Sequence, residues 1–248
     1  MELIPITLGV SRPVKTAGAT KRKSTANKEG GADQTGSATA KSLAPELRNK
    51  IFARDNNTCR CCGFQSKKYQ EILFLNGDVN DTGPKNLATV CIFCHQCFHL
   101  DQVSTMRSGV LLWLPEITQV QLHHIARAIY VARISQGAAA DAARKALDTL
   151  MERREEVKRR IKVDDPYILG MVLKDYLSTG QYKLRAKKLD GVRLFPLDRR
   201  IIKEAALEFN QFPQILAYWR SKDGPFGGKA PPSWLSIYQE HAQGSKAA

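Results

Sequence analysis

Four of the six cysteines form two Cys-x-x-Cys pairs, Cys59 with Cys62 and Cys91 with Cys94. Each spacing brings two thiolates to the tip of one tight turn, and two such turns can enclose a Zn²⁺ ion at about 2.3 Å per sulfur. Four thiols on one metal form an inert folding nucleus, whereas four free thiols would be reactive. The pattern therefore predicts one structural Zn²⁺ held by these four cysteines.

A redox role fits the paired cysteines less well than zinc. A redox dithiol would be a single Cys-x-x-Cys beside a βαβ pattern, and this chain has two pairs without such a pattern. Cys61 is expected to be a spare thiol, and Cys97 to pack as a small hydrophobic residue. His123 and His124 are adjacent on a predicted helix, so at most one can face a given site. We expect both to be ordinary surface or boundary residues rather than ligands.

The segments around the cysteines follow the order of a known nuclease module. A predicted helix over residues 45–55 leads to Cys59, an apolar run over 72–75 follows, and a polar loop leads through Asn86 to Cys91. This order resembles the zinc-bearing HNH nuclease family over residues 44–100. The resemblance implies a ββα unit for a catalytic metal, beside a four-cysteine zinc that holds the loops together.

The catalytic half of that module is incomplete. An HNH enzyme needs a histidine at the end of its first strand to activate water, and residues 71–75 contain none. Asn86 matches the central asparagine and His95 the closing histidine. Glu71 could replace the missing base, but a carboxylate that leads an apolar strand is more often an exposed edge residue. The sequence thus predicts an HNH-like fold that keeps its structural zinc and lacks nuclease activity.

The charge distribution does not single out this module. The net charge of +14 is of a kind that attracts nucleic acid or acidic surfaces. Residues 51–100 hold five basic and four acidic side chains, however, whereas residues 151–200 hold fourteen and eight. The basic runs at 21–23, 158–162 and 183–188 are expected to be solvated helix faces. An acidic protein tail or an anionic membrane would be attracted by the same field.

Length and composition set the wider expectations. A chain of 248 residues with 43% hydrophobic residues can bury one sizeable core or two modest ones. No apolar run reaches about eighteen residues, and the first residues lack the basic region of a signal peptide. We therefore expect a cytoplasmic protein without direct membrane insertion. A reducing compartment favours thiolate–zinc coordination over disulfides.

The chain is predicted to be α+β, with the zinc-bearing HNH-like module followed by a mostly helical region. Residues 1–43 are expected to form a strand over 2–10 and a flexible basic insertion over 11–41, and residues 44–108 the Cys₄ module. Residues 109–210 are expected to pack on that module. Their predicted elements are a strand over 109–114, a helix capped by Thr118, a helix over 138–161, a helix from Asp165 to about 180 and a helix over 199–210. Residues 211–248 are expected to be a C-terminal extension with a Pro/Gly linker over 224–232.

A closer resemblance rests on several short stretches. They are Cys-x-x-Cys-Gly-Phe-Gln (59–65), Leu-Asn-Gly-Asp (75–78), Cys-x-Phe-Cys-x-Gln-Cys-Phe (91–98) and Leu-Trp-Leu-Pro-Glu-Ile-Thr-Gln (112–119). Together they resemble the DotN (IcmJ) family of the type IVB secretion or conjugation coupling complex. The resemblance implies a degenerate HNH-like fold around a Cys₄ zinc. It also implies binding to the C-terminal tail of the coupling ATPase and to other coupling-complex subunits, at the inner face of the bacterial inner membrane.

Three functional hypotheses follow. The first is a non-enzymatic adaptor of the coupling complex that helps to recruit substrates for translocation. The second is a metal-dependent HNH-type DNA endonuclease that uses His95, Asn86 and Glu71. The third is a zinc-stabilised module that binds nucleic acid without chemistry, for which the basic run 183–188 would be the contact surface. The missing strand histidine and the nearly neutral module favour the adaptor, and nucleic acid is the less favoured partner.

Overall fold

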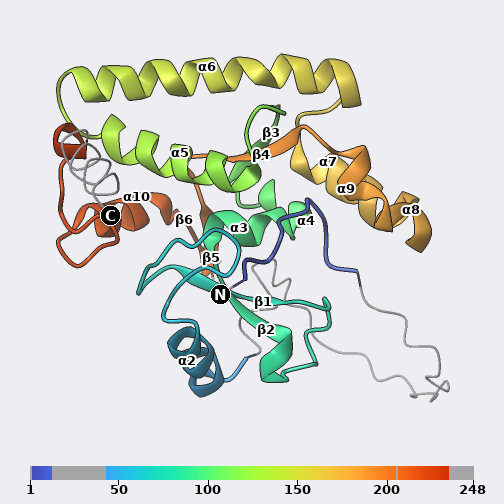
Figure 1. Ribbon diagram of the computed structural model, residues 1–248. Coiled ribbons are helices and arrows are strands. Elements are labelled where there is room, and N and C mark those ends of the chain that lie inside the picture. Colours follow the sequence, from blue (N-terminus) through green and yellow to red (C-terminus); the bar gives the residue numbers. More distant parts are fainter. Residues whose placement is uncertain (1, 13–42, 205, 235–248) are drawn as a thin grey trace, which may run out of the picture.

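The computed structural model describes residues 2–12, 43–204 and 206–234 (Figure 1). From residue 13 on, the predicted flexible insertion lies outside the described residues, as does the end of the predicted C-terminal extension. The elements follow the chain in this order: α2 (Pro45–Arg54), β1 (Gln70–Phe74), η1 (Pro84–Asn86), β2 (Leu87–Cys91), α3 (Ile92–Cys97), α4 (Leu100–Val103), β3 (Gly109–Trp113), α5 (Gln119–Arg133), α6 (Ala138–Ile161), α7 (Pro166–Met171), η2 (Val172–Tyr176), α8 (Thr179–Lys183), α9 (Arg185–Lys188), β4 (Val192–Pro196), β5 (Ile201–Glu204), β6 (Leu207–Asn210), α10 (Phe212–Arg220) and η3 (Pro231–Ser233).

The cysteine-bearing part is built on the antiparallel hairpin β1–β2, in which Gln70 pairs with Cys91 and Phe74 with Leu87. Helix α2 precedes it and packs on β2. The helix begins with a proline at its first position, where no backbone donor is needed. At its end Asp55 is 1% exposed and accepts a 2.9 Å hydrogen bond from the Thr89 amide in β2. This contact holds the helix end against the strand that leads into the second cysteine pair.

The remaining part is mostly helical, around the antiparallel pair β3–β4. Strand β3 ends before Pro115, as predicted, and pairs from Gly109 with Pro196 to Trp113 with Val192. Helix α5 begins at the predicted capping box, in which Thr118 and Gln121 each bond the other's backbone amide. Helix α6 spans the predicted residues 138–161 and covers both α5 and β3 (Figure 1). The mixed content of helices and small sheets agrees with the predicted α+β class.

Three predicted elements are wrong or incomplete. Residues 199–210 form the hairpin β5–β6, with Ile201 paired to Asn210, instead of a helix. The Ile201 amide donates a hydrogen bond to Met106 O, and the Asn210 side chain accepts one from the Arg200 amide. The periodicity of apolar residues, on which the predicted helix rested, does not reveal such contacts. Residues 2–12 are extended but join no sheet among the described residues. The helix from Asp165 continues as one π-turn and ends at Tyr176, and Ser178 caps a new helix.

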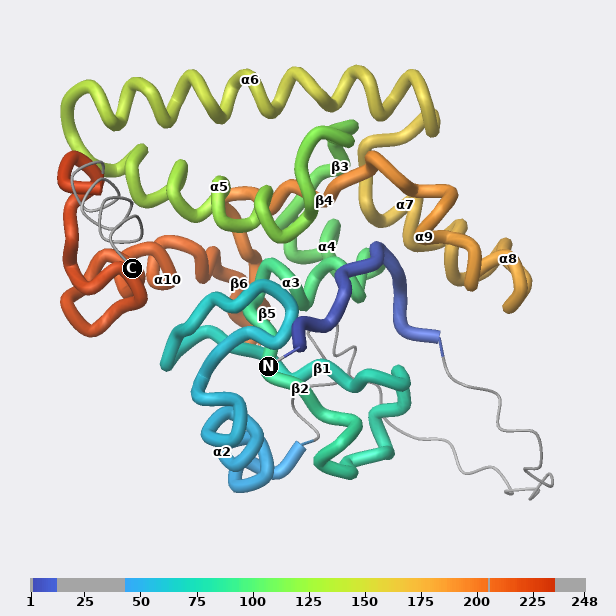
Figure 2. The backbone as a smooth tube through the Cα atoms, in the orientation of Figure 1, coloured from blue at the N-terminus to red at the C-terminus, as the bar shows by residue number. Residues whose placement is uncertain are grey.

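The two parts lie side by side, as the backbone in Figure 2 shows, and they share one core. The largest cluster of buried side chains contains the four paired cysteines together with residues of α5, β4 and α10. Aromatic rings surround them: the rings of Phe93, Phe212 and Trp219 meet with centroids 5.6–6.5 Å apart. A second cluster joins Leu8 and Val10 to Cys97, Leu111 and other residues. The domain boundaries predicted above stay a prediction.

Within the described residues, none of the helices combines the length and apolar character needed to span a membrane. The longest, α6, carries charged residues along its whole length.

Candidate metal centre

The four paired cysteines come from two short turns that the fold brings face to face. Cys59 and Cys62 lie in a turn closed by a 2.9 Å bond from the Gly63 amide to Cys59 O. Gly63 has φ +74°, a left-handed conformation that glycine adopts without strain. Cys91 ends β2 and caps α3, and its sulfur accepts a 3.4 Å hydrogen bond from the Cys94 amide. A strand end and a helix start thus present the second pair.

The sulfur positions fit a single tetrahedral metal. All four Sγ atoms lie within 4.8 Å of one another, and Cys62 Sγ is 3.7 Å from Cys91 Sγ. A tetrahedron with metal–sulfur bonds of about 2.3 Å has edges of about 3.8 Å. A disulfide would require about 2.05 Å, and all six cysteines are free thiols. The four cysteines could therefore hold one metal ion.

The burial and the donor set indicate a structural rather than a catalytic site. Cys59, Cys62, Cys91 and Cys94 are each at most 5% exposed, so neither substrate nor bulk water reaches the sulfurs. Four soft thiolates suit Zn²⁺, and a closed set of four protein ligands leaves no position for a reacting water. Residue His95, which follows Cys94, is not part of the sulfur cluster.

A buried arginine lies against this cluster. Arg127 of α5 is 1% exposed, and its Nη2 donates to Cys91 Sγ at 2.8 Å and lies 3.7 Å from Cys62 Sγ. Burial alone would raise the pKa of the Cys91 thiol. Hydrogen bonds from the neighbouring cysteines and the charge of Arg127 outweigh burial and hold that pKa well below its ordinary value. The surroundings of Cys91 therefore favour its thiolate form.

His123 is not the surface residue predicted from the sequence. Its ring is fully buried, with Nδ1 3.3 Å from Cys94 Sγ, whereas His124 is exposed and bonds Cys62 O at 2.9 Å. Burial lowers the pKa of His123 to about 3, so the ring is neutral. The helical spacing of Leu122, Ile125, Ile129 and Ala132 predicts that they form the buried face of α5. Ile125 is instead 40% exposed and His123, Ala126 and Tyr130 are buried, so the buried face is rotated from the predicted one. The helix directs His123 and Arg127 toward the sulfurs, and the periodicity of apolar residues does not reveal that orientation.

The two further cysteines lie near the cluster without joining it. Cys97 is fully buried, as expected of a small hydrophobic residue, and its thiol donates to Phe93 O at 3.5 Å. Burial raises its pKa well above the ordinary value, so the thiol stays protonated. Cys61 is 1% exposed and lies in the first turn, between two of the proposed ligands.

The three residues of the nuclease hypothesis serve structural contacts. Asn86 accepts from the Asn76 amide at 2.9 Å and donates to Asp81 O at 2.8 Å, which closes the loop between β1 and η1. Glu71 is not an exposed edge residue as predicted. Its side chain is 13% exposed and pairs with two arginines, Arg48 at 3.3 Å and Arg200 at 3.0 Å.

His95 is 4% exposed and packs against another histidine. The ring centroids of His95 and His99 lie 4.3 Å apart. Burial lowers the pKa of His95 well below its ordinary value and that of His99 to about 4, so both rings are neutral. Within the described residues, His95, Asn86 and Glu71 form no hydrogen bond or ion pair with one another.

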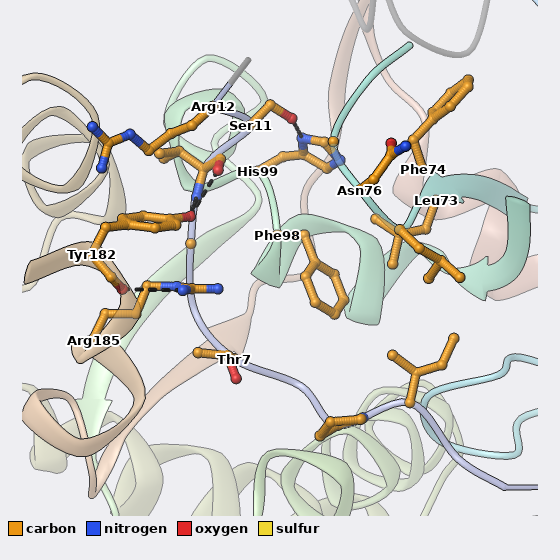
Figure 3. Close-up of a pocket in the computed structure, with 16 residues that line it drawn as sticks. Thr7, Ser11, Arg12, Leu73, Phe74, Asn76, Phe98, His99, Tyr182 and Arg185 are labelled. Atoms are coloured by element: carbon orange, nitrogen blue, oxygen red, sulfur yellow. Dashed lines mark hydrogen bonds between the residues drawn. The ribbon is translucent and has the colours of Figure 1, made fainter. Parts of the chain in front are cut away.

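A cavity of about 330 Å³ lies apart from the cysteines, between the N-terminal segment and the end of β1. Figure 3 shows Arg185 extending toward Phe98 within it. Its polar groups hold the N-terminal segment: Tyr182 Oη donates to Val10 O at 2.8 Å, and Arg185 Nε donates to Leu8 O at 3.2 Å. These polar groups of the cavity therefore serve mainly to hold the N-terminal segment in place.

These features define a class: a protein of mixed helices and small sheets with a buried four-cysteine cluster that could hold one metal ion. No protein-family model matches the chain. It is 31% identical over 159 residues to the "Type 4 apparatus protein DotN" of Legionella pneumophila subsp. pneumophila, covering 62% of this chain and 74% of that protein. The chain belongs to the DotN family, which confirms the resemblance drawn from the motifs.

Proposed function

We propose that this protein is a non-enzymatic adaptor of a type IV secretion apparatus. It would bind the C-terminal tail of the coupling ATPase and so help to recruit substrates for translocation. Membership in the family of a type 4 apparatus protein supports this most directly. The closed cysteine site supports it further, because a metal sealed in the core can hold a fold together but cannot reach a substrate.

The proposed cofactor is one structural Zn²⁺ bound by Cys59, Cys62, Cys91 and Cys94. The proposed fold is a degenerate HNH-like module over residues 44–108, with residues 109–210 packed on it. The hairpin β1–β2 followed by α3 supports the ββα interpretation. The protein would act in the cytoplasm, at the inner face of the inner membrane.

The segment α7–α9 is the best candidate for the docking surface. Five of the ten large hydrophobic side chains that are exposed among the described residues lie between positions 167 and 184. They are Tyr167, Ile168, Val172, Tyr176 and Leu184, with exposures of 41–75%. Such a concentration of apolar surface is typical of interaction sites. It lies at one end of the molecule, in the orange helices of Figure 1.

The two basic runs differ in whether their charges are already paired, and this difference indicates which partner would bind. In the basic run of α6, Lys158 pairs with Glu155, and Arg159 and Arg160 pair with Glu156. In the second run, Lys183, Lys187 and Lys188 are exposed and form no ion pair within the described residues. Basic side chains without partners beside exposed apolar ones fit an acidic, amphipathic protein segment. The tail of the coupling ATPase is proposed to supply that segment.

The test measures binding of synthetic peptides that span the cytoplasmic C-terminal tail of the cognate coupling ATPase. Isothermal titration calorimetry should show micromolar or tighter binding. Replacing Lys183, Lys187 and Lys188 together by glutamate should raise the Kd at least tenfold. A matched variant with the exposed Lys67, Lys85 and Lys145 replaced by glutamate has the same net charge and should stay within twofold.

Two results would overturn the proposal at different levels. No binding of any tail peptide at 100 μM would refute the adaptor role as stated. Tight binding that both triple variants weaken equally would refute only the α7–α9 surface. The wild-type chain could instead bind duplex DNA with a steep salt dependence, and the triple replacement of Lys183, Lys187 and Lys188 could abolish that binding. In that case the nucleic-acid hypothesis would replace the adaptor.

A further inference from the structure

Helix α5 directs two buried polar side chains at the proposed metal ligands. His123 and Arg127 are one helical turn apart on the same face, and both are at most 1% exposed. Arg127 Nη2 contacts Cys91 and Cys62, and His123 Nδ1 contacts Cys94, so α5 reaches three of the four ligand sulfurs. The helix lies far along the chain from the cysteines, outside the predicted zinc module.

The charge of Arg127 needs a negative partner. A buried guanidinium without a counter-charge is strongly unfavourable, and within the described part of the chain no carboxylate pairs with it. Its Nε and Nη1 find no hydrogen-bond acceptor there. Its carbon CZ lies 4.0 Å from the ring centroid of Phe64 and 5.0 Å from that of Phe93. The groups that face it and can carry negative charge are two cysteine sulfurs, Cys91 Sγ at 2.8 Å and Cys62 Sγ at 3.7 Å.

The proton of His123 can be placed from its neighbours. Gln119 Oε1 accepts from the Leu194 amide at 2.9 Å, and its Nε2 donates to Leu194 O at 2.7 Å, so the backbone of β4 fixes the orientation of this amide. Gln119 Nε2 therefore also donates to His123 Nε2, at 2.9 Å. Since Nε2 is the acceptor of the neutral ring, Nδ1 carries the hydrogen and directs it at Cys94 Sγ.

We propose that α5 supplies the outer shell of the metal centre: Arg127 offsets part of its negative charge, and His123 orients Cys94. This inference rests on the proposed zinc site. Four thiolates around Zn²⁺ carry a net charge of −2, and the positive charge of Arg127 makes the total −1. Outer-shell donors of this kind fix the ligands and tune affinity. Metal binding then holds α5 and β4 to the cysteine loops, so the two parts of the chain are one metal-dependent unit.

The experiment compares Arg127→Met, Arg127→Lys and His123→Leu with the wild-type chain. The zinc dissociation constant is measured by competition with a chromophoric chelator, and the sulfur-to-metal charge-transfer bands are recorded with Co²⁺. Arg127→Met should raise the Kd 10- to 100-fold, with Arg127→Lys between it and the wild type. His123→Leu should shift the Co²⁺ bands. Arg133→Met is the matched control on the same helix, because Arg133 pairs with Asp198 at the surface, and it should stay within twofold.

Unchanged affinity in Arg127→Met would overturn the inference while leaving the zinc site intact. A wild-type chain that binds neither Zn²⁺ nor Co²⁺ would refute the proposed metal centre itself. If Arg127→Met does not fold, hydrogen exchange of the wild type decides. Chelation should deprotect the amides of α5 together with those of the cysteine loops, and unchanged protection of α5 would overturn the inference.

Discussion

Removing the metal should lower the thermal stability of the whole unit. The ion would join two turns whose nearest cysteines, Cys62 and Cys91, are 29 residues apart. A cross-link that closes a loop of this length lowers the entropy of the unfolded chain by an amount equivalent to about 3.6 kcal/mol at 25 °C. For a protein of this size, 1 kcal/mol shifts Tm by about 2–4 °C, so chelation should lower Tm by at least about 7–14 °C.

The assay is calorimetry of the metal-loaded and EDTA-treated protein, with residual zinc measured by mass spectrometry. Cys62→Ser should reproduce the effect of EDTA and lower the zinc content. The control is Cys97→Ala, which removes a buried thiol of the second core cluster that is not one of the proposed ligands. It should lower Tm modestly while keeping one zinc per chain. A fully metal-free protein that melts within about 2 °C of the loaded form would refute the reasoning.

Three further substitutions test separate contacts of the fold. Asp55→Asn should lower stability by about 2 kcal/mol in urea unfolding at pH 7. Burial raises the pKa of Asp55, but hydrogen bonds from Arg54 and Thr89 outweigh it and lower the pKa. The stabilisation is therefore complete above the ordinary value of 3.8 and lost as pH falls through the lower folded-state pKa, so equal losses at pH 7 and pH 2 would contradict it. Gly191→Ala should lower the free energy of unfolding by about 2–4 kcal/mol and change tryptophan fluorescence. The reason is that Gly191 has φ +83° and a Cβ there would lie 2.5 Å from the Trp113 ring. An unchanged urea midpoint would count against this packing. Asn86→Ala should cost about 1–3 kcal/mol and leave the zinc content unchanged, and loss of zinc would mean that the loop supports the metal site directly.

The parts of the site that the sequence could predict are those set by local spacing. Two Cys-x-x-Cys turns define a ligand set before any fold is known, because each pair depends only on the turn that contains it. The cap of α5 and the extent of α6 are local in the same sense, since caps and helical periodicity act over a few residues. The structure shows these elements near their predicted positions.

The parts that the sequence could not predict depend on contacts between distant residues. His123 seemed an ordinary helix residue because nothing within one turn of it indicates a sulfur neighbour. One signal was available for Arg127: Tyr130 and Val131, three and four residues later, share its side of the helix, and a charge beside them is unfavourable. The hairpin β5–β6 was missed for a similar reason. Its Ile201 amide bonds Met106, which lies almost a hundred residues earlier.

The seating of the N-terminal segment has a consequence for synthesis. Val10 exchanges two hydrogen bonds with Tyr182, which lies 172 residues later in the chain. At about 5–20 residues per second, the ribosome makes Tyr182 roughly 10–35 s after Val10. Leu8 and Val10 cannot complete their packing in the second core cluster before that interval has passed, because Tyr182 packs against the same cluster. The final burial of this segment is therefore among the late steps of folding.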